Sequence, residues 1–290
     1  MTTESWQNIP HVSYIYNPDV TEFLAEFKEF TANHTGKNGE KITFNAVLLK
    51  AFAEAIKADP EINAHMHFEK GLVRGKVTVF DNIDISVPWT LPSGEMMTIT
   101  MKDMGNKSLR DIAEYQANIN HRLEKTDLTE ALYSVSFNDT IDKLKKGHVI
   151  QALKRLYGAN TNKKHKIVRL KGAAKKAYEA IPETERVTHK DLKQGTITIS
   201  NIGADTKGIS GEVAMLMVIP PQVCAIGVGT LQRRPVVVKD ENGEEKIEIR
   251  TILPIDICFD HRALDFGEVR PFLSKLEEIF ANPKLILNDD

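Results

Sequence analysis

The order of strand and helix patterns constrains this fold more than any other feature of the sequence. Near the C-terminus three strand patterns follow one another directly, over 236–238, 246–253 and 255–259, with the hairpin-turn sequence Glu241-Asn242-Gly243 between the first two. A doubly wound parallel sheet instead needs a crossover connection, usually a helix, between its neighbouring strands. The sequence therefore predicts a mixed α+β fold in which a sheet is flanked by helices as a two-layer sandwich.

Apolar periodicity gives the other elements. Apolar residues three and four positions apart indicate helices, and alternating or short apolar runs indicate strands. Thr43 and Ser108 are the expected N-caps of the second and third helices. The expected helices cover 21–32, 43–56, 108–125 and 267–280, and the expected further strands cover 11–16, 76–80, 83–87, 96–101, 196–200 and 223–228.

Composition excludes several classes of protein. The net charge of −2 gives no bulk attraction to nucleic acid, and no apolar run approaches the ~18 residues of a membrane span. Residues 1–6 do not resemble a signal peptide. Cys224 and Cys258 lie in apolar runs, which is typical of buried thiols in a reducing compartment. We expect a cytoplasmic protein that neither binds nucleic acid nor spans a membrane.

Residues 143–193 differ from their surroundings in charge. They contain 15 Lys or Arg and 4 Asp or Glu, whereas the remainder of the chain is net acidic. Two amphipathic pieces, 149–157 and 167–181, predict short helices within this basic segment.

His261 is the first candidate for chemistry. It lies in a loop between the last strand and the last helix, and an imidazole there can remove a proton from a thiol or hydroxyl. Asp265 follows four residues later, and its spacing to Glu268 is also that of a helix capping box. From spacing alone, a surface histidine followed by a capping aspartate explains the pattern better than a catalytic pair does.

Ser200 is the second candidate. It ends an alternating strand, where its hydroxyl could donate a hydrogen bond to an oxyanion, but Ser-Asn-x-Gly is also a common turn. The chain has no Gly-x-Ser-x-Gly elbow, Walker loop or His-Glu-x-x-His motif. His65 and His67 would share one face of a strand, but a surface strand explains them better than a metal site, so no metal is expected.

Asp260-His261-Arg262-Ala263-Leu264-Asp265 resembles the Asp-His-Arg-x-x-Asp-Gly signature of the acyltransferase component of 2-oxoacid dehydrogenase complexes. Chloramphenicol acetyltransferase shares that fold and its His-x-x-x-Asp-Gly core. Five further segments resemble family motifs in the family's order: Ile9-Pro10-His11-Val12, Lys41 to Ala64, Lys107-Ser108-Leu109, Thr196 to Gly203, and Pro220 to Gly229.

The resemblance implies a coenzyme A-dependent acyltransferase with a chloramphenicol acetyltransferase-like fold. His261 would be the general base toward a thiol, hydroxyl or amine acceptor, and Ser200 would bind the oxyanion. Asp265 would hold the His261 loop in shape, while Asn201 and Gly203 would lie at the coenzyme. The family forms trimers with the active site in a channel between subunits, so a homotrimer binding acyl-CoA is implied.

The resemblance covers most of the chain outside 148–190. It implies one catalytic domain over 1–290 with a basic helical insertion at about 143–193, in a stand-alone member without a lipoyl domain or lipoyl group. The insertion is interpreted as a solvated helical hairpin; a flap over the coenzyme phosphates, a dock for an acidic carrier protein and a membrane-surface contact are alternatives.

Three departures from the family pattern are visible. Phe266 stands where the family has glycine, the Arg- and Lys-rich helix before Ile9 is missing, and 93–98 replace a Gly-Leu-Val-Val-Pro strand. Phe266 and the missing helix favour one alternative function, a catalytically silent oligomeric scaffold. An antibiotic O-acetyltransferase is a further alternative, over which the motifs favour the dehydrogenase type.

Overall fold

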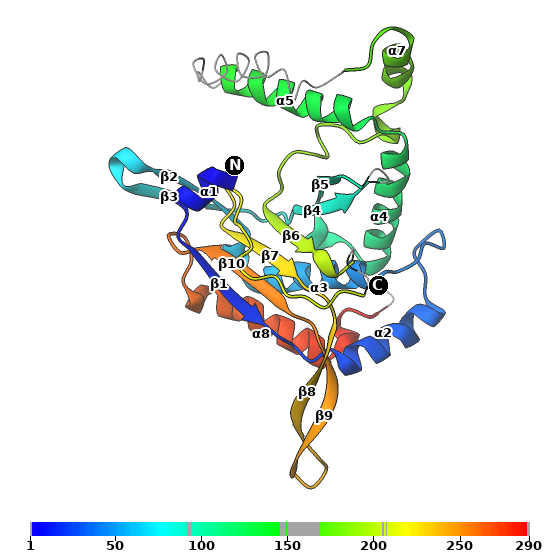
Figure 1. The fold of residues 1–290 in the computed structure, drawn as a ribbon, viewed down its shortest axis with the longest axis vertical. Helices are drawn as coiled ribbons and strands as arrows, with labels where there is room; N and C mark the ends of the chain where they lie inside the picture. Colours follow the sequence, from blue (N-terminus) through cyan, green and yellow to red (C-terminus); the bar gives the residue numbers. More distant parts are fainter. Residues whose placement is uncertain are drawn as a thin grey trace. The chain divides into compact units, whose positions relative to one another are not determined.

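The computed structural model (Figure 1) describes residues 2–91, 94–145, 149, 169–204, 206 and 208–288. The chain divides into two compact units. The larger unit contains Met1–Gln116 and Gly195–Asp290, and the smaller one contains Ala117–Gln194. The expectation of one domain over 1–290 stays a prediction.

A six-stranded mixed sheet lies at the centre of the larger unit. Strand β6 is parallel to both β4 and β7, and the remaining neighbours are antiparallel, which confirms the predicted mixed sheet. In spatial order the strands are β1 (His11–Tyr16), β10 (Ile255–Asp260), β7 (Cys224–Val228), β6 (Ile197–Asn201), β4 (Ile85–Thr90) and β5 (Met96–Met101).

Helices α3 (Phe44–Ala58) and α8 (Phe266–Ala281) pack together along the sheet, and α2 (Thr21–Asn33) lies beside α8. The apolar stripe predicted for the second expected helix is buried in α3, where the rings of Phe52 and Phe272 stack. The Thr43 hydroxyl accepts a hydrogen bond from the Ala46 N–H at 3.1 Å, so the predicted cap is confirmed. These helices are the layer expected from the sequence.

An extended segment around Leu216 and Val218 packs beside the small side chains of Ala225 and Cys258 in the sheet. The buried carboxylate of Asp256 accepts a hydrogen bond from the Leu216 N–H at 2.8 Å and another from the Ser13 hydroxyl, which ties this segment and β1 to β10. Cys258 and Cys224 are buried and free, as predicted, and burial raises the pKa of the Cys258 thiol to about 12.

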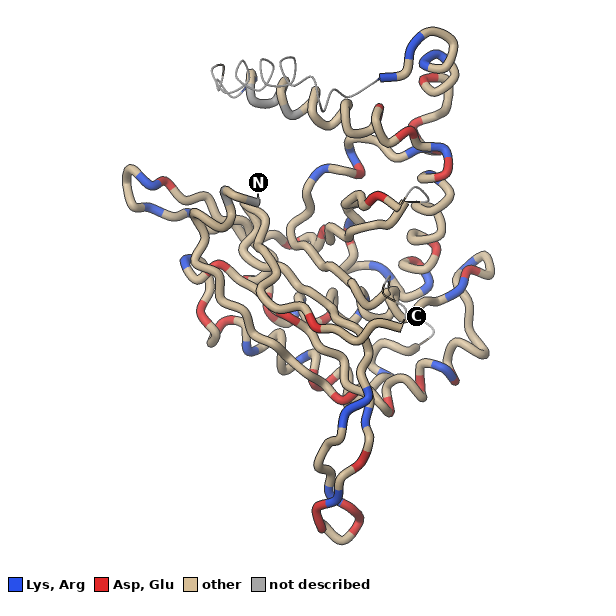
Figure 2. Tube along the Cα trace, viewed as in Figure 1, with Lys and Arg blue, Asp and Glu red and all other residues tan. Residues whose placement is uncertain are grey.

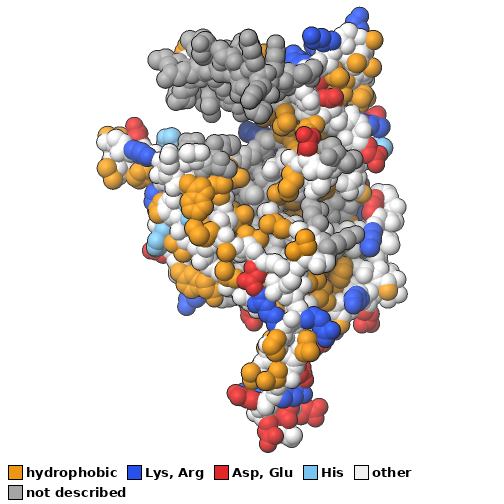
Figure 3. All heavy atoms as spheres, in the orientation of Figure 1, with side chains coloured by type: hydrophobic (Ala, Val, Ile, Leu, Met, Phe, Trp, Pro, Cys, Tyr) orange, Lys and Arg blue, Asp and Glu red, His pale blue; other side chains and the backbone are white. Residues whose placement is uncertain are grey.

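Two hairpins extend the larger unit. Strands β2 (Ala64–Glu69) and β3 (Arg74–Val79) form one, and β8 (Gln232–Lys239) and β9 (Glu245–Ile252) form the other, with the predicted turn at Gly243 in left-handed backbone. Acidic residues gather at the tip of the β8–β9 hairpin and basic ones at its base (Figure 2). Apolar side chains are exposed along the same hairpin (Figure 3), among them Val237, Ile247 and Ile249.

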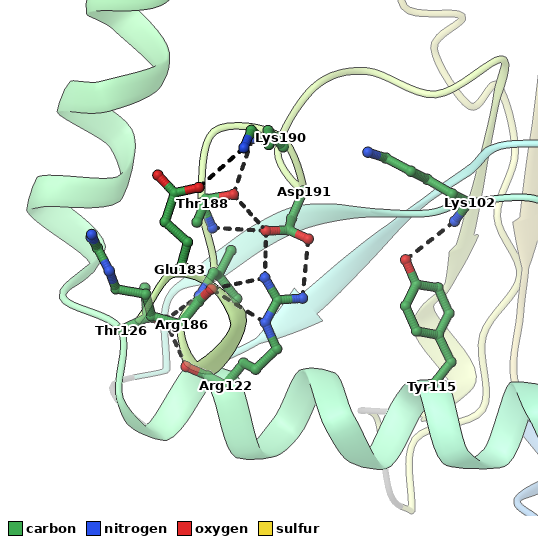
Figure 4. A network of polar contacts seen from close by, with 10 residues as sticks. Lys102, Tyr115, Arg122, Thr126, Glu183, Arg186, Thr188, Lys190 and Asp191 are labelled. Atoms are coloured by element: carbon green, nitrogen blue, oxygen red, sulfur yellow. Dashed lines mark hydrogen bonds and ion pairs between the residues drawn. The ribbon is translucent and has the colours of Figure 1, made fainter. Parts of the chain in front are cut away.

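The smaller unit begins inside α4 (Leu109–Glu124) and contains α5 (Leu128–Lys145) and α7 (Gly172–Ala180). The Arg122 guanidinium donates to the Asp191 carboxylate at 2.6 Å and to the Arg186 carbonyl at 2.8 Å (Figure 4). Hydrogen bonds from Arg122 and the Thr188 N–H keep the pKa of Asp191 below its usual value despite burial. Arg122 lies near the start of the smaller unit and Asp191 near its end, so this ion pair holds the two ends of the unit's polypeptide together.

Some expectations differ from the structure. A short polar helix, α1 (Thr2–Asn8), precedes β1, although no helix was expected there. Helix α5 was also not predicted, because its apolar residues do not form one continuous stripe. Helix α7 lies in the expected piece 167–181, whereas all of the piece 149–157 except Val149 lies outside the described residues.

A methyl group at Gly203 should destabilise the larger unit. Its Cβ would lie 2.3 Å from the Gly229 carbonyl oxygen, a backbone atom that cannot move without disturbing the end of β7. We expect Gly203→Ala to lower the free energy of unfolding by about 1–3 kcal/mol in urea titrations. Gly211→Ala is the control, since no atom of the described residues lies within 4 Å of its added methyl group. Equal denaturation midpoints for the two variants would contradict this close approach.

The carboxyl group of Asp59 should make stability depend on pH. The residue is 4% exposed, its Oδ2 has no hydrogen-bond partner among the described residues, and burial raises its pKa to about 6. Protonated Asp59 therefore stabilises the fold below pH ~4, and that stabilisation is lost as the pH rises through ~6.

Asp59→Asn keeps the shape and cannot ionise. Relative to wild type, we expect its free energy of unfolding to rise by about 3 kcal/mol between pH 4 and pH 7. Denaturant titrations at both pH values measure the difference. Parallel pH profiles for the two proteins would show that Asp59 titrates normally.

Candidate active site

Strand β10 places His261 at one end of the sheet. The strand ends at Asp260, and the next N–H, that of His261, donates to the Pro10 carbonyl at 3.0 Å. Arg262 donates to both carboxylate oxygens of Asp260, at 2.9 and 2.6 Å, and its guanidinium lies 4.9 Å from the centre of the Phe68 ring. An ion pair to a buried carboxylate and a backbone hydrogen bond therefore hold this loop.

The contacts of the His261 ring indicate which nitrogen carries the proton. Its Nδ1 lies 3.1 Å from the Leu264 carbonyl oxygen and 3.2 Å from the Asp265 carboxylate. Both oxygens are acceptors, so we assign the ring hydrogen to Nδ1. Nε2 then carries a lone pair and has no hydrogen-bond partner among the described residues, and the side chain is 48% exposed. This imidazole is oriented to accept a proton from a bound molecule.

Asp265 has a structural role that the sequence suggested. It caps α8, and its N–H donates to the Glu268 carboxylate at 2.6 Å in the predicted capping box. Phe266, at the departure from the family pattern, begins α8, and its ring packs on Tyr14 with 4.9 Å between ring centres. The helix therefore starts normally after Asp265 with phenylalanine at this position.

Ser200 lies near the end of β6, opposite Gly227 of β7. Its side chain is partly exposed, and it forms no hydrogen bond with any described residue. The next residue, Asn201, points to the other face of the sheet, where its amide donates to the Asn45 side chain at 2.9 Å and its oxygen accepts from the Ala204 N–H. The Ser200 hydroxyl is thus available as a donor, whereas Asn201 already holds a turn.

Within one chain the structure does not bring Ser200 and His261 together. Ser200 is level with Gly227, which pairs with Asp256, and His261 follows Asp256 by five residues along the chain. Five residues of strand correspond to about 16 Å along the sheet. His261 and Asp265 lie at one end of β10, and Ser200, Asn201 and Gly203 lie at the opposite end.

A cavity of about 490 Å³ opens at the Ser200 end of the sheet. Its lining includes the predicted residues Asn201 and Gly203, and also Asn45 and Arg233, which sequence reasoning missed. Arg233 is exposed and has no ion pair with a described residue. Its position shortly after the expected buried strand was a signal that could have marked it. The cavity combines apolar walls with a cation that no described carboxylate neutralises.

His65 and His67 lie on β2, for which the sequence predicts a surface strand in preference to a metal site. His65 donates from Nε2 to the Gly195 carbonyl at 3.2 Å and packs edge-on against Phe80, and burial lowers its pKa. Over the described ranges no three His, Cys, Asp or Glu side chains gather in a metal-binding arrangement. No helix in the part of the chain that the structure describes is both long and apolar enough to cross a bilayer.

Comparisons with known proteins agree with this architecture. The family model for the catalytic domain of 2-oxoacid dehydrogenase acyltransferases matches residues 1–136 and 159–288. The dihydrolipoyllysine-residue acetyltransferase component of the pyruvate dehydrogenase complex of Mycoplasma capricolum is 22% identical over 284 residues, which are 98% of this chain and 48% of that protein. The chain thus spans about half the length of this relative.

Two solved structures share the fold. The cubic core of the pyruvate dehydrogenase multienzyme complex superimposes with a TM-score of 0.63 at 21% identity, covering 99% of this chain and 88% of that one. The dihydrolipoamide acetyltransferase of Azotobacter vinelandii gives a TM-score of 0.62 at 20% identity, with the same coverage.

The Asp260–Arg262 pair should be essential to the stability of the His261 loop. Asp260 is 1% exposed, so Arg262→Met would leave an uncompensated buried carboxylate. We expect a loss of about 3–5 kcal/mol in the free energy of unfolding, and a smaller loss for Arg262→Lys. Guanidinium titrations measure both, and the double variant Asp260→Asn/Arg262→Met should recover part of the loss. Wild-type stability in Arg262→Met would show that the carboxylate needs no partner.

Proposed function

The chain belongs to the family of 2-oxoacid dehydrogenase acyltransferase catalytic domains, and on this premise we propose that it transfers an acyl group directly between coenzyme A and an acceptor thiol, hydroxyl or amine. The observation that carries the proposal is the His261 ring, whose Nδ1 is engaged by Leu264 and Asp265 and whose Nε2 is free among the described residues. The name of the relative from Mycoplasma capricolum specifies a dihydrolipoyllysine residue, which favours a thiol acceptor.

In the proposed reaction His261 Nε2 accepts the proton of the acceptor thiol. The resulting thiolate attacks the thioester carbonyl of acyl-CoA, and the carbonyl oxygen becomes an oxyanion to which the Ser200 hydroxyl donates. Collapse of this intermediate breaks the bond to the coenzyme sulfur, which takes the proton back from His261. The acyl group passes directly to the acceptor with no acyl-enzyme, and Asp265 positions the imidazole without transferring a proton.

The separation of Ser200 and His261 supports a site that two copies of the chain complete. One copy would supply the β10 loop with His261, and a neighbouring copy would supply the end of β6 with Ser200. A cyclic homotrimer repeats such a contact between all its subunits, and each contact then forms one active site. One solved structure with the same fold is the cubic core of a multienzyme complex, which agrees with assembly through repeated contacts.

The cavity at the Ser200 end supports a place for coenzyme A. Asn201 and Gly203 line it, and Arg233, which pairs with no described carboxylate, offers a cation to the coenzyme phosphates. The chemistry described here uses only side chains and needs neither a metal nor a lipoyl group on this chain. A cytoplasmic location agrees with two free, buried cysteines.

Substitution of His261 tests the proposal. With acetyl-CoA as donor and dihydrolipoamide as acceptor, released coenzyme thiol is followed by separating the products. We expect His261→Ala to lower kcat at least ~10²-fold because the general base is lost. Ser200→Ala should lower kcat by about 10²–10³-fold through loss of the oxyanion donor.

His67→Ala is the matched control, because His67 is exposed on β2 and has no role in the proposed reaction, and it should leave the rate unchanged. Activity that survives His261→Ala would exclude this imidazole as the general base. A wild-type chain that consumes no acyl-CoA would instead support the scaffold alternative.

A mixing experiment tests whether two chains form each site. His261→Ala and Ser200→Ala chains are unfolded together in equal amounts and refolded. After random assembly, about a quarter of the interfaces contain both a native His261 and a native Ser200. About a quarter of the wild-type activity should therefore return. Refolding each variant alone is the control. Activity no higher in the mixture than in the separate variants would place both groups in one chain.

A further inference from the structure

The smaller unit contains a cavity of about 350 Å³ between α5, α7 and the segments that flank α7. We propose that this cavity binds a small organic anion with a flat apolar body, such as an aryl carboxylate or aryl phosphate. The proposal is independent of the acyltransferase site, since none of its residues takes part in that reaction. Its lining residues are Glu130, Tyr133, Ser134, Phe137, Arg169, Tyr178, Glu179 and Arg186.

One wall of the cavity is a face of α5. Its four lining residues are spaced three and four positions apart, so they point to the same side of the helix. The rings of Tyr133 and Phe137 are nearly parallel, with an angle of 14° and 6.2 Å between their centres, and Phe137 is 53% exposed. This wall offers flat apolar surface to a ligand.

Most charges of the cavity already have partners. Arg169 donates to the Glu130 carboxylate at 3.0 Å and lies 3.7 Å above the Tyr133 ring, and this pairing lowers the pKa of Glu130. Glu179 lies 3.5 Å from the Lys175 ammonium group. Both carboxylates are therefore neutralised, which disfavours a cationic ligand.

Arg186 is different, because no described carboxylate forms an ion pair with it; the Glu183 carboxylate, which attracts it electrostatically, is paired with Lys190 at 3.1 Å. The Arg186 Nε donates to the Ile181 carbonyl at 3.1 Å, and its guanidinium lies 4.5 Å from the Tyr178 ring centre. Neither terminal amino group of Arg186 has an acceptor within the described ranges. A guanidinium held over a ring with two donors unused is suited to bind a carboxylate or phosphate.

Tyr178 gives an independent indication. The residue is 8% exposed, lines the same cavity, and its buried hydroxyl has no hydrogen-bond partner in the part of the chain described. A buried donor without an acceptor is unfavourable, and an oxygen-rich ligand supplies acceptors. The unused hydrogen-bond donors of Arg186 and Tyr178 favour an anionic ligand. The rings of Tyr133 and Phe137 favour a ligand with a flat apolar body.

The cavity lies next to a segment that the family model does not match. The model is interrupted at residues 137–158, and Phe137 is the first residue of this interruption. The other lining residues occur on both sides of it, in ranges that the model matches.

Calorimetric titration of the full chain tests the proposal with phenylacetate and phenyl phosphate. Benzyl alcohol lacks the charge, benzylamine reverses it, and inorganic phosphate lacks the aromatic body, so these three should bind weakly or not at all. We expect Arg186→Met to weaken binding of both aryl anions at least ~10-fold, in line with loss of a charged hydrogen bond. Tyr178→Phe should weaken binding several-fold.

Lys176→Met is the matched control, since Lys176 is exposed on α7 and does not line the cavity. It removes the same charge and should leave both affinities unchanged. Equal weakening of aryl-anion binding in Lys176→Met and Arg186→Met would show that only the net charge of the protein matters, which would overturn the proposal. Absence of binding by both aryl anions would also overturn it.

Circular dichroism establishes whether Arg186→Met is folded. If it is not, Phe137→Ala takes its place, because this side chain is exposed and its loss should weaken aryl anions while leaving inorganic phosphate unaffected. Unchanged aryl-anion affinity in Phe137→Ala would then overturn the proposal.

Discussion

The antiparallel pairing of β10 with β7 is the constraint on which the proposed site depends. Because β7 runs parallel to β6 and antiparallel to β10, the C-terminal ends of β10 and β6 lie at opposite ends of the sheet's strands. His261 and Ser200 each lie at the end of their strand, so the ladder keeps them apart within one copy. The same backbone hydrogen bonds that stabilise the sheet thus require a second copy for the proposed chemistry.

Polar groups buried at the sheet hold the loops that surround the site. Asp256 ties an extended segment and β1 to β10, and Asp260 ties the His261 loop through Arg262. Each carboxylate satisfies several donors, so burial is compensated locally. The imidazole is therefore presented by a loop fixed on both sides, while its Nε2 faces no described hydrogen-bond partner.

Local patterns predicted the elements that bury an apolar stripe or alternate in polarity. Strand β1 has the predicted bounds, β7 begins one residue later than predicted, and α8 is longer than predicted by one residue at each end. The proximity of His261 and Asp265 was predictable because the two are four residues apart in one loop. The distance from Ser200 was not predictable, since spatial strand order depends on contacts remote in sequence. Arg186 was missed for the same reason, because only a structure shows that no described carboxylate forms an ion pair with it. The sequence marks Arg233 only by its position shortly after a buried strand, and the structure adds that it lines a cavity.

Helix α5 illustrates another limit, because its polar and apolar residues do not separate into faces. An ion pair between Arg122 and Asp191 holds together the two ends of the polypeptide that contains this helix. Lengthening a loop whose ends are already held costs little entropy, about 0.6 kcal/mol for each doubling. Insertions or deletions between Arg122 and Asp191 should therefore cost the fold little stability, provided that both residues of this ion pair are kept.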